Sequence, residues 1–325
     1  MQREPTSISI VTLNWNGLTD TLECLSSVEK LTYPNVRTIV VDNASSDNQA
    51  DTIEKAFPNV VVLRQSENLG FCGGCNVGIR YALENGADYV MLLNNDAIVT
   101  PDLVDKLLEG VAKVGNFGAA SPIILEHEIP NNISYSDAKW DTAKARLRLT
   151  EPGVRLEDVS SREPYTSEFA NGCCLLAPSD VFRREGLLDE RYFAYHDEAE
   201  WCARVRRHGY ESYVIPNALV YHKGSGSTPG LVSTYLLTRN KMLWMKENLP
   251  FRERIKSYPY LAKEVVWHLS NLAGLTHALY SKQHSRALLQ GYIDYFCGRF
   301  YKWNKRTEKL IFPNKPSADI ESTRV

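Results

Sequence analysis

The sequence predicts an α/β protein built on a largely parallel sheet with helices on both faces. Strand-like and helix-like patterns alternate through the first hundred residues, with short connections between them. Polar side chains also gather directly after the strand-like runs. Repeated strand–helix units favour parallel strands joined by right-handed crossovers. Ligands of such open sheets bind at the carboxyl ends of the strands, so the polar clusters mark the expected site.

Four short apolar runs predict the strands of this region. They are Ser7–Leu13, Val36–Val41, Val60–Leu63 and Tyr89–Leu93. Helices are predicted where apolar residues recur with helical spacing, or where a polar cluster or a proline opens the segment. The first predicted helix has an apolar face made of Leu18, Leu22, Leu25 and Val28. The next three predicted helices cover about Asn48–Phe57, Asn76–Glu84 and Pro101–Val114. The cluster Asp42–Asp47 is expected to cap the helix over residues 48–57.

The pattern is weaker after about Glu126. As far as Tyr165, polar residues and prolines predict an insertion or an irregular hairpin that covers one face. Regular secondary-structure patterns resume with the run Phe169–Ala177, and further predicted elements follow it. These are a short helix capped by Ser179 and ended by Gly186, a helix over Asp197–His208 followed by Gly209, and short strands at Val214–Ile215 and Leu219–His222.

Beyond about Gly230 the chain is predicted to be mostly helical. An apolar helix face is marked by Leu261, Val265, Leu269, Leu272 and Leu279, and a loose tail with Pro313 and Pro316 follows. The sequence therefore predicts an α/β catalytic domain over residues 1–229 and a basic, amphipathic helical extension over residues 230–325.

Length and composition exclude several classes of protein. The 325 residues suffice for a full core, and 43% hydrophobic with 23% charged residues excludes disordered, collagen-like and disulfide-dense chains. The net charge of −2 disfavours binding of nucleic acid along the whole chain. Seven scattered cysteines and the lack of an apolar leader or span predict a cytoplasmic protein. Cys72-x-x-Cys75 is expected to be packing and not a metal or redox site.

Three predicted strands end in polar clusters that could carry chemistry. Asn94, Asn95 and Asp96 offer the oxygen ligands that hard divalent cations take, although such a cluster can also cap the next helix. Asn14–Asn16 and Asp42–Asp47 can hydrogen-bond a base and a ribose. For Asp42–Asp47, helix capping is the alternative.

Two further segments belong to the expected site. A Gly-rich run over residues 68–78 opens a helix and could turn N–H groups toward a phosphate, or could form a tight loop. It matches neither the dinucleotide-binding nor the P-loop pattern. Asp197, Glu198 and Glu200 lie together at the start of a predicted helix. Neighbouring carboxylates raise one another's pKa, which suits proton abstraction from a hydroxyl. The alternative is that these residues form an acidic first turn paired with Arg204. His222 follows a predicted strand, either as a metal ligand or as a structural residue.

The order and spacing of these segments resemble the inverting family 2 glycosyltransferases with a GT-A fold, particularly the bacterial rhamnosyltransferase-like branch. The resemblance runs from about Ser7 to Ser227. It rests on Ile10–Asn14, Val41–Ser45, Asn68–Asn76, Leu93–Asp96, Phe193–Glu200 with Arg204, and His222. It implies a mixed, mostly parallel central sheet flanked by helices. The implied activity is metal-assisted transfer of a sugar from a nucleoside-diphosphate donor, of the dTDP-rhamnose or UDP-hexose class, to a hydroxyl of a glycan or lipid-linked acceptor in cell-surface polysaccharide assembly.

The same resemblance implies roles for single residues. The donor-binding residues would be Asn14, Asp42, Asn43, Asn68, Asn76, Asn94, Asn95 and Gly172, with Asp42 on the pyrimidine ring. Asp96 and His222 would hold a divalent metal, Mg²⁺ or Mn²⁺. Glu198 would be the catalytic base, with Asp197 as second choice, because the family's Glu-Asp pair is inverted here. Asn94 replaces the first aspartate of the family's Asp-x-Asp motif.

The helical extension is strongly basic. From Arg239 to Lys309 there are 14 Lys and Arg against 5 Asp and Glu, a net of +9 that leaves −11 for the rest of the chain. Basic residues such as Arg239 and Lys241 alternate with aromatic ones such as Trp244 and Trp267, which suits an anionic membrane interface. The alternative is helical packing with a solvated basic face. We therefore expect a cytoplasmic protein that is peripheral on the inner face of the plasma membrane, with homo-oligomerisation left open.

Two other functions fit parts of the sequence. A sugar-nucleotide pyrophosphorylase would need a basic, Gly-rich signature after the first strand, and Asn14-Trp-Asn-Gly17 lacks it. A non-catalytic nucleotide-sugar-binding member of the same fold is consistent with Asn94 and with the inverted acidic pair.

Overall fold

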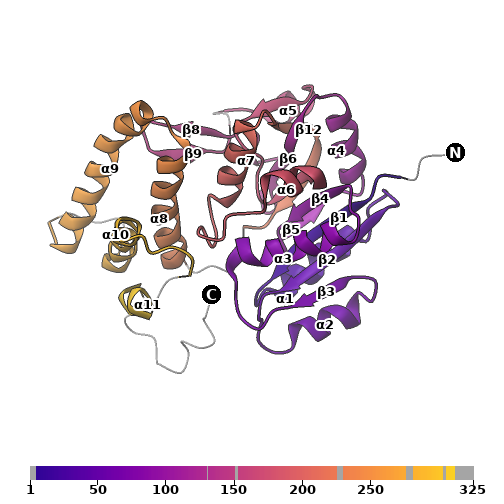
Figure 1. Cartoon of the computed structure of the whole chain (residues 1–325), viewed down its shortest axis with the longest axis horizontal. Coiled ribbons are helices and arrows are strands. Elements are labelled where there is room, and N and C mark those ends of the chain that lie inside the picture. Colours follow the sequence, from indigo (N-terminus) through magenta and orange to yellow (C-terminus); the bar gives the residue numbers. More distant parts are fainter. Residues whose placement is uncertain are drawn as a thin grey trace.

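The structure, a computed structural model, describes residues 5–129, 131–150, 153–224, 230–275, 281–302 and 305–311. The predictions for Leu279 and for the tail with Pro313 and Pro316 lie outside these residues. Alternating apolar runs and helical stretches fold as one large sheet with helices on both faces and a group of helices beside it (Figure 1).

The sheet is mixed, and its N-terminal half is parallel. Its strands run in the order β10-β12-β6-β11-β4-β1-β2-β3, while β5 pairs with β12 and β7 with β6. The strands are β1 (Ile8–Asn14), β2 (Val36–Asp42), β3 (Val61–Arg64), β4 (Tyr89–Leu93), β5 (Ala97–Val99), β6 (Phe117–Glu126), β7 (Ile133–Tyr135), β10 (Tyr165–Ser167), β11 (Cys174–Pro178) and β12 (Glu211–His222). β4, β1, β2 and β3 pair in parallel, and antiparallel β11 joins them to the parallel pair β6–β12. The predicted mixed, mostly parallel sheet flanked by helices is confirmed.

Helices cover both faces because side chains of the strands alternate between them. α1 (Leu18–Val28) and α2 (Gln49–Ala56) bury the face that carries Val40. α3 (Gly70–Glu84) lies on the opposite face, where the Cα of Gly78 approaches Val11 and Val41. The remaining helices against the sheet are α4 (Leu103–Ala112), α5 (Leu156–Ser160), α6 (Ser179–Glu185) and α7 (Asp197–Arg207).

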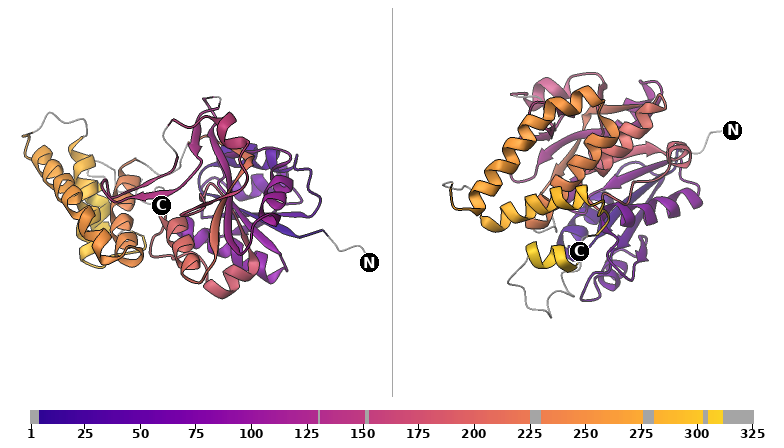
Figure 2. Two further views of the ribbon diagram at one scale, coloured as in Figure 1. Left: turned by 90° about the horizontal axis from the view of Figure 1, so that it is seen from above. Right: turned by 60° about the vertical axis from the view of Figure 1, so that its left-hand side comes forward.

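The predicted insertion is a set of short strands with an arm that reaches the C-terminal helices. The arm is the hairpin of β8 (Lys139–Asp141) and β9 (Arg146–Arg148) (Figure 2). Its Trp140 ring packs on Trp244, with the ring centroids 4.8 Å apart. Beside it, the Ser257 hydroxyl donates to the Thr142 carbonyl at 3.0 Å. The irregular hairpin region therefore ties the sheet to the helices beside it.

These helices are α8 (Gly230–Asn248), α9 (Phe251–Leu272), α10 (Lys282–Phe296) and α11 (Lys305–Ile311). α8 and α10 pack closely because Gly291 leaves room for the Tyr235 carbonyl. Met242, Leu243 and Met245 of α8 join the core that contains the sheet residues. In the part of the chain that the structure describes, no helix is long and apolar enough to cross a bilayer.

Several predictions about elements are wrong. α3 starts at Gly70 and not near Asn76, because the Gly-rich run is helical and lies close against β1. β5 and β6 were not predicted, and β12 is one bulged strand instead of two short pieces.

Three predicted side-chain roles are also wrong. Neither Ser179 nor the cluster Asp42–Asp47 caps a helix through a side chain, since Pro178 precedes α6 and Asn48 precedes α2 without such a bond. Arg239 and Trp244 are buried and are therefore not surface residues of a basic face.

Candidate active site

The carboxyl ends of β1 and β2 hold the first polar cluster together. Parallel pairing sets Asn14 opposite Asp42, and the Asn14 amide donates to the Asp42 carboxylate at 2.9 Å. Asn14 also donates to Ser45 and accepts from Thr21 at 2.9 Å each. Asn14 is fully buried, so this pair forms the inner support of the strand edge.

Asn43 and Asn68 connect that edge to the start of α3. The Asn43 side-chain amide donates to the Asn68 side-chain oxygen Oδ1 at 2.9 Å, and the same oxygen accepts from the Gly70 N–H at 2.7 Å. Gly70 has φ of +74°, and a Cβ atom there would lie 2.6 Å from the Phe193 carbonyl oxygen. Only glycine therefore allows α3 to begin against the loop that precedes α7.

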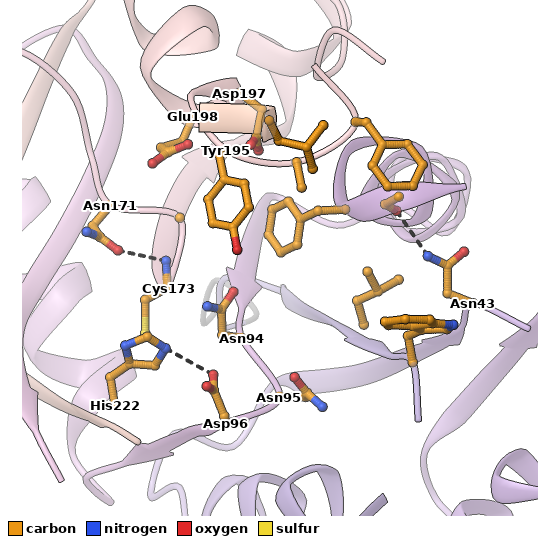
Figure 3. A pocket seen from close by; sticks show the side chains of 18 of the residues that line it. Asn43, Asn94, Asn95, Asp96, Asn171, Cys173, Tyr195, Asp197, Glu198 and His222 are labelled. Atoms are coloured by element: carbon orange, nitrogen blue, oxygen red, sulfur yellow. Dashed lines mark hydrogen bonds and ion pairs between the residues drawn. The ribbon is translucent and has the colours of Figure 1, made fainter. Parts of the chain in front are cut away.

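A cavity of about 410 Å³ lies at this strand edge, a volume within the range of ligand sites (Figure 3). Nine of the predicted site residues line it: Asn43, Asn68, Asn94, Asn95, Asp96, Gly172, Asp197, Glu198 and His222. Asn14, Asp42 and Asn76 are not among the lining residues. Asn76 is buried, and its amide donates to the Leu188 carbonyl at 2.9 Å and to Glu190 at 3.0 Å.

Asp96 and His222 meet at one end of the cavity. β5 pairs with β12 so that Ala97 lies opposite His222, and this brings the Asp96 carboxylate to 3.0 Å from His222 Nε2. The nearby Lys223 ammonium is engaged by Asp20 at 2.9 Å and by Glu23. Among the described residues there is no group of three or more His, Cys, Asp and Glu side chains arranged for a metal. A cation here would need amide or ligand oxygens besides these two side chains.

The acidic group at the start of α7 divides into two parts. Glu200 forms an ion pair with Arg204 at 3.0 Å, so for this residue the predicted alternative of pairing with Arg204 is confirmed. Asp197 and Glu198 instead line the cavity (Figure 3). Burial, and secondarily the Glu198 charge, raises the pKa of Asp197 well above its usual range. Burial also raises the pKa of Glu198, so both carboxyls hold a proton more tightly than in water.

Gly172 lies directly against Glu198. A Cβ atom at this glycine would lie 3.7 Å from the Glu198 side chain, which is ordinary van der Waals contact, so Gly172 and Glu198 are direct neighbours at the cavity. β11 pairs antiparallel with β4, and the Asn94 N–H donates to the Cys173 carbonyl at 2.9 Å. This pairing brings the loop over residues 171–173 to the edge that carries Asn94 and Asp96.

The apolar wall of the cavity was not predicted from the sequence. This wall consists of Leu13, Trp15, Phe71, Phe193, Tyr195 and Leu236. Trp15 and Tyr195 lie within segments already singled out, so their position beside polar site residues was a usable signal. Leu236 comes from α8, in the predicted extension, and no sequence signal points to it.

Comparison with known proteins agrees with this geometry. The family model "Glycosyl transferase family 2" matches residues 8–153. The chain is 26% identical to the N-acetylglucosaminyl-diphospho-decaprenol L-rhamnosyltransferase of Mycobacterium tuberculosis over 68% of this chain and 77% of that protein. It is 23% identical to the dTDP-rhamnosyl transferase RfbF of Shigella flexneri over 81% of this chain and 88% of that protein.

A solved structure shares the fold. It is the mannosyltransferase PcManGT from Pyrobaculum calidifontis in complex with GDP-Man and Mn²⁺, with a TM-score of 0.54 and 13% identity over 91% of this chain and 88% of that one. The sheet order, the cavity at the strand ends and these similarities agree: residues 8–153 match the family 2 glycosyltransferase model, and the chain has the GT-A fold.

Proposed function

We propose that the protein transfers a sugar from a nucleoside-diphosphate donor to an acceptor hydroxyl with inversion, using Glu198 as the base. The observation that supports this most is the single cavity shared by Glu198, Gly172, Asp96 and His222. It offers a carboxylate for proton abstraction at one end and oxygen and nitrogen ligands at the other.

We propose a dTDP-rhamnose or UDP-hexose donor. Amide side chains of Asn43, Asn68, Asn94 and Asn95 can bond ribose and phosphate oxygens, and the buried Asp42 supports the strand edge on which the base would lie. The names of the two rhamnosyltransferase relatives favour rhamnose, and that of the Mycobacterium protein favours a lipid-linked acceptor.

A divalent cation fits the residues at the Asp96 end of the cavity. The Asp96 carboxylate and the His222 ring lie 3.0 Å apart, and the Asn94 and Asn95 amide oxygens lie on the same loop, which is a donor set suited to Mg²⁺ or Mn²⁺. When bound, such a cation would neutralise charge on the leaving diphosphate. Asn94 contributes no negative charge, so the protein supplies one carboxylate and the donor diphosphate would supply the rest.

Glu198 would take the proton from the acceptor hydroxyl as this oxygen attacks the anomeric carbon. The leaving diphosphate departs from the opposite face, which inverts the anomeric centre. Burial and the neighbouring Glu198 charge raise the pKa of Asp197, and burial raises that of Glu198, so Glu198 would be the first of the pair to ionise. Gly172 leaves space beside Glu198 for the sugar.

A kinetic experiment tests the base. We expect Glu198→Gln to abolish transfer while calorimetry still detects donor binding, because the amide keeps the shape and removes the basic oxygen. The control is Glu211→Gln, an exposed residue at the start of β12, which should leave both quantities unchanged. Transfer at the wild-type rate by Glu198→Gln would contradict the assignment.

A binding experiment tests the donor and the cation together. Thermal-shift measurements with dTDP-, UDP- and GDP-sugars, each with and without Mn²⁺ or Mg²⁺, should show the largest rise in midpoint for the true donor with metal. Asp96→Ala should remove the metal-dependent part of that rise. A metal-independent shift of the same size in wild type and variant would count against the cation. Donor binding without hydrolysis or transfer would favour the non-catalytic alternative.

We further propose that α9 binds an anionic membrane surface. The helical extension over residues 230–325 would thereby attach the catalytic domain, residues 1–229, to that membrane. Ile255, Tyr258, Val266 and Leu269 are exposed along this helix, with fractions from 45% to 62%. Exposed Arg252, Lys256 and Lys263 lie on the same helix. An apolar stripe with basic neighbours suits a lipid surface with negative head groups.

Flotation with liposomes tests this surface. The protein should float with anionic vesicles at low salt and less at high salt, and Val266→Glu with Leu269→Glu should abolish flotation. Ile129→Glu with Leu149→Glu, an equal change of charge at two exposed apolar residues of the α/β part, is the control. Failure to float would contradict the membrane contact, and a concentration-dependent dimer lost in the α9 variant would instead assign the stripe to self-association.

A further inference from the structure

The loop before α7 is held in an unfavourable backbone conformation. Phe193, Tyr195 and His196 have φ of +66°, +69° and +64°, although none is glycine. Each such residue costs about 1–3 kcal/mol and persists only where the surroundings fix it. The loop leads directly into Asp197 and Glu198, and its Phe193, Ala194 and Tyr195 line the cavity. Whatever fixes this loop therefore also fixes the catalytic end of the site.

Asn240 of α8 contacts the loop through its backbone. Its side-chain amide donates to the carbonyl oxygens of Tyr192, Ala194 and Tyr195 at 2.8, 2.7 and 2.9 Å. The residue is fully buried, so these bonds are not shared with bulk water. The two hydrogens of this amide group are thus shared among three carbonyl groups of a loop that forms neither helix nor strand.

Arg239 completes the contact. Its guanidinium donates to the carbonyls of Tyr192 at 3.0 Å, Arg191 at 3.2 Å and Tyr301 at 2.7 Å, and its Nε donates to the Asn240 side-chain oxygen at 3.0 Å. Arg239 is also fully buried, and burial lowers the pKa of its guanidinium. Because buried charges are costly, an apolar pair would serve stability as well. The geometry points to a different role.

We propose that Arg239 and Asn240 are positioning residues for the transfer reaction. They fix the backbone over residues 191–195, and thereby the direction in which α7 presents Glu198 and in which Tyr195 faces the cavity. The helical extension is then part of the catalytic unit and not only an attachment to a surface. This inference rests on the proposed function only in taking Glu198 as the base.

The test compares Asn240→Ala with Asn248→Ala, the same change on the same helix. Asn248 accepts from Arg207 on the outer side and does not bond to the loop. We expect Asn240→Ala to lower kcat about 10- to 100-fold with donor Kd nearly unchanged, since small displacements of a reacting group have effects of this size. The pH profile of kcat should also shift, because the surroundings of Glu198 change. Asn248→Ala should change none of these.

Hydrogen exchange gives a readout that does not depend on activity. Backbone amides over residues 191–200 should exchange faster in Asn240→Ala and in Arg239→Lys, which keeps the charge but loses the fork of donors. Should Asn240→Ala fail to fold, Arg239→Lys takes its place in the kinetics. Unchanged kcat and pH profile despite faster exchange, or unchanged exchange in a folded variant, would overturn the proposal. A wild-type protein without transfer activity, with exchange as expected, would contradict the proposed function and leave the loop contact standing.

Discussion

At the scale of single residues, the candidate site separates two adjacent carboxyl groups by their surroundings. Asp197 is 2% exposed, and within the described residues its Oδ2 atom has no hydrogen-bond partner. Glu198 is only partly buried and lines the cavity beside Gly172. An unsatisfied buried carboxylate is costly, so the neutral form of Asp197 is favoured in the folded protein. Its neighbour can then carry the charge that proton abstraction requires.

This difference predicts how stability depends on pH. The pKa of Asp197 is raised in the folded protein by burial and by Glu198, so the folded state binds this proton more tightly than the unfolded chain does. Stability is therefore full below the ordinary carboxyl pKa and falls as pH rises through the window above it. Asp197→Asn, which resembles the neutral form, should raise the melting temperature more at about pH 8 than at about pH 5. The measurement is thermal unfolding of wild type and variant at both pH values.

The exposed residue Asp180 supplies the control for this comparison. Asp180→Asn should change the melting temperature by similar small amounts at both pH values, because this side chain lies in solvent. A rise for Asp197→Asn that is independent of pH would mean that packing, and not ionisation, distinguishes the two side chains.

Single residues also show how far sequence could predict the site. Asp96 and His222 are 126 positions apart in the sequence. Their proximity was predicted only from the resemblance to a known family, which assigned both residues to one metal site. Asn43, Asn94 and Asn95, predicted from the strand ends, line the cavity because parallel strands bring their carboxyl ends to one edge of the sheet. The place of Leu236 in the cavity wall could not be predicted from the sequence, because an apolar residue on a helix is most often part of a core.

At the scale of elements, α3 shows why glycines gather after β3. Cβ atoms at Gly74 and Gly78 would lie 2.3 Å from side-chain atoms of Leu13 and Val11. The helix can therefore lie directly on β1 and hold Asn43 and Asn68 at the strand edge. The composition predicts a loop, because glycine is unfavourable inside a helix, but here close packing outweighs that preference.

Gly78→Ala should therefore destabilise the protein by about 1–3 kcal/mol through overpacking, despite the gain in helix propensity. Urea unfolding measures the change. Gly115→Ala is the control, because a Cβ atom there meets nothing within 4 Å and the backbone is not left-handed. Equal midpoints for the two variants would show that β1 and α3 can separate without cost.

The strand β6 explains the largest gap in the predicted fold. Its sequence, FGAASPIILE, contains Gly118 and Pro122 and no alternation, because eight consecutive residues are buried on both faces. Such a run cannot be told from a buried helical segment by its periodicity. Its place beside β12 depends on a parallel pairing with residues about ninety positions later, which no local pattern encodes.

At the scale of the whole molecule, the charge asymmetry has a different meaning in the structure than in the sequence. Arg239, counted in the basic segment, is fully buried beside the site. Lys241 forms an ion pair with Glu264 at 3.0 Å and is mostly covered. Part of the positive charge thus stabilises the junction between the sheet and the helices, while Arg252, Lys256 and Lys263 of α9 are exposed to solvent.

The junction predicts that the extension does not fold separately from the sheet. Met242, Leu243, Trp244 and Met245 are each at most 8% exposed and belong to the same core as the strands. Removing residues 230–325 would expose this surface, free the loop before α7 and delete Leu236 from the cavity wall. Stacking and burial make Trp244→Ala alone cost about 3–5 kcal/mol.

We therefore expect residues 1–229 alone to lack a cooperative unfolding transition and to bind a hydrophobic dye, because buried apolar surface of this extent cannot face water without loosening the core. Calorimetry of the full chain should show one transition, with Trp244→Ala shifting that whole transition downward. Two separable transitions, or a truncated protein with native near-ultraviolet circular dichroism, would instead establish the extension as an independent module. In that case the control of Glu198 by α8 would have to be mediated by docking between two folded units, and its strength would depend on their association.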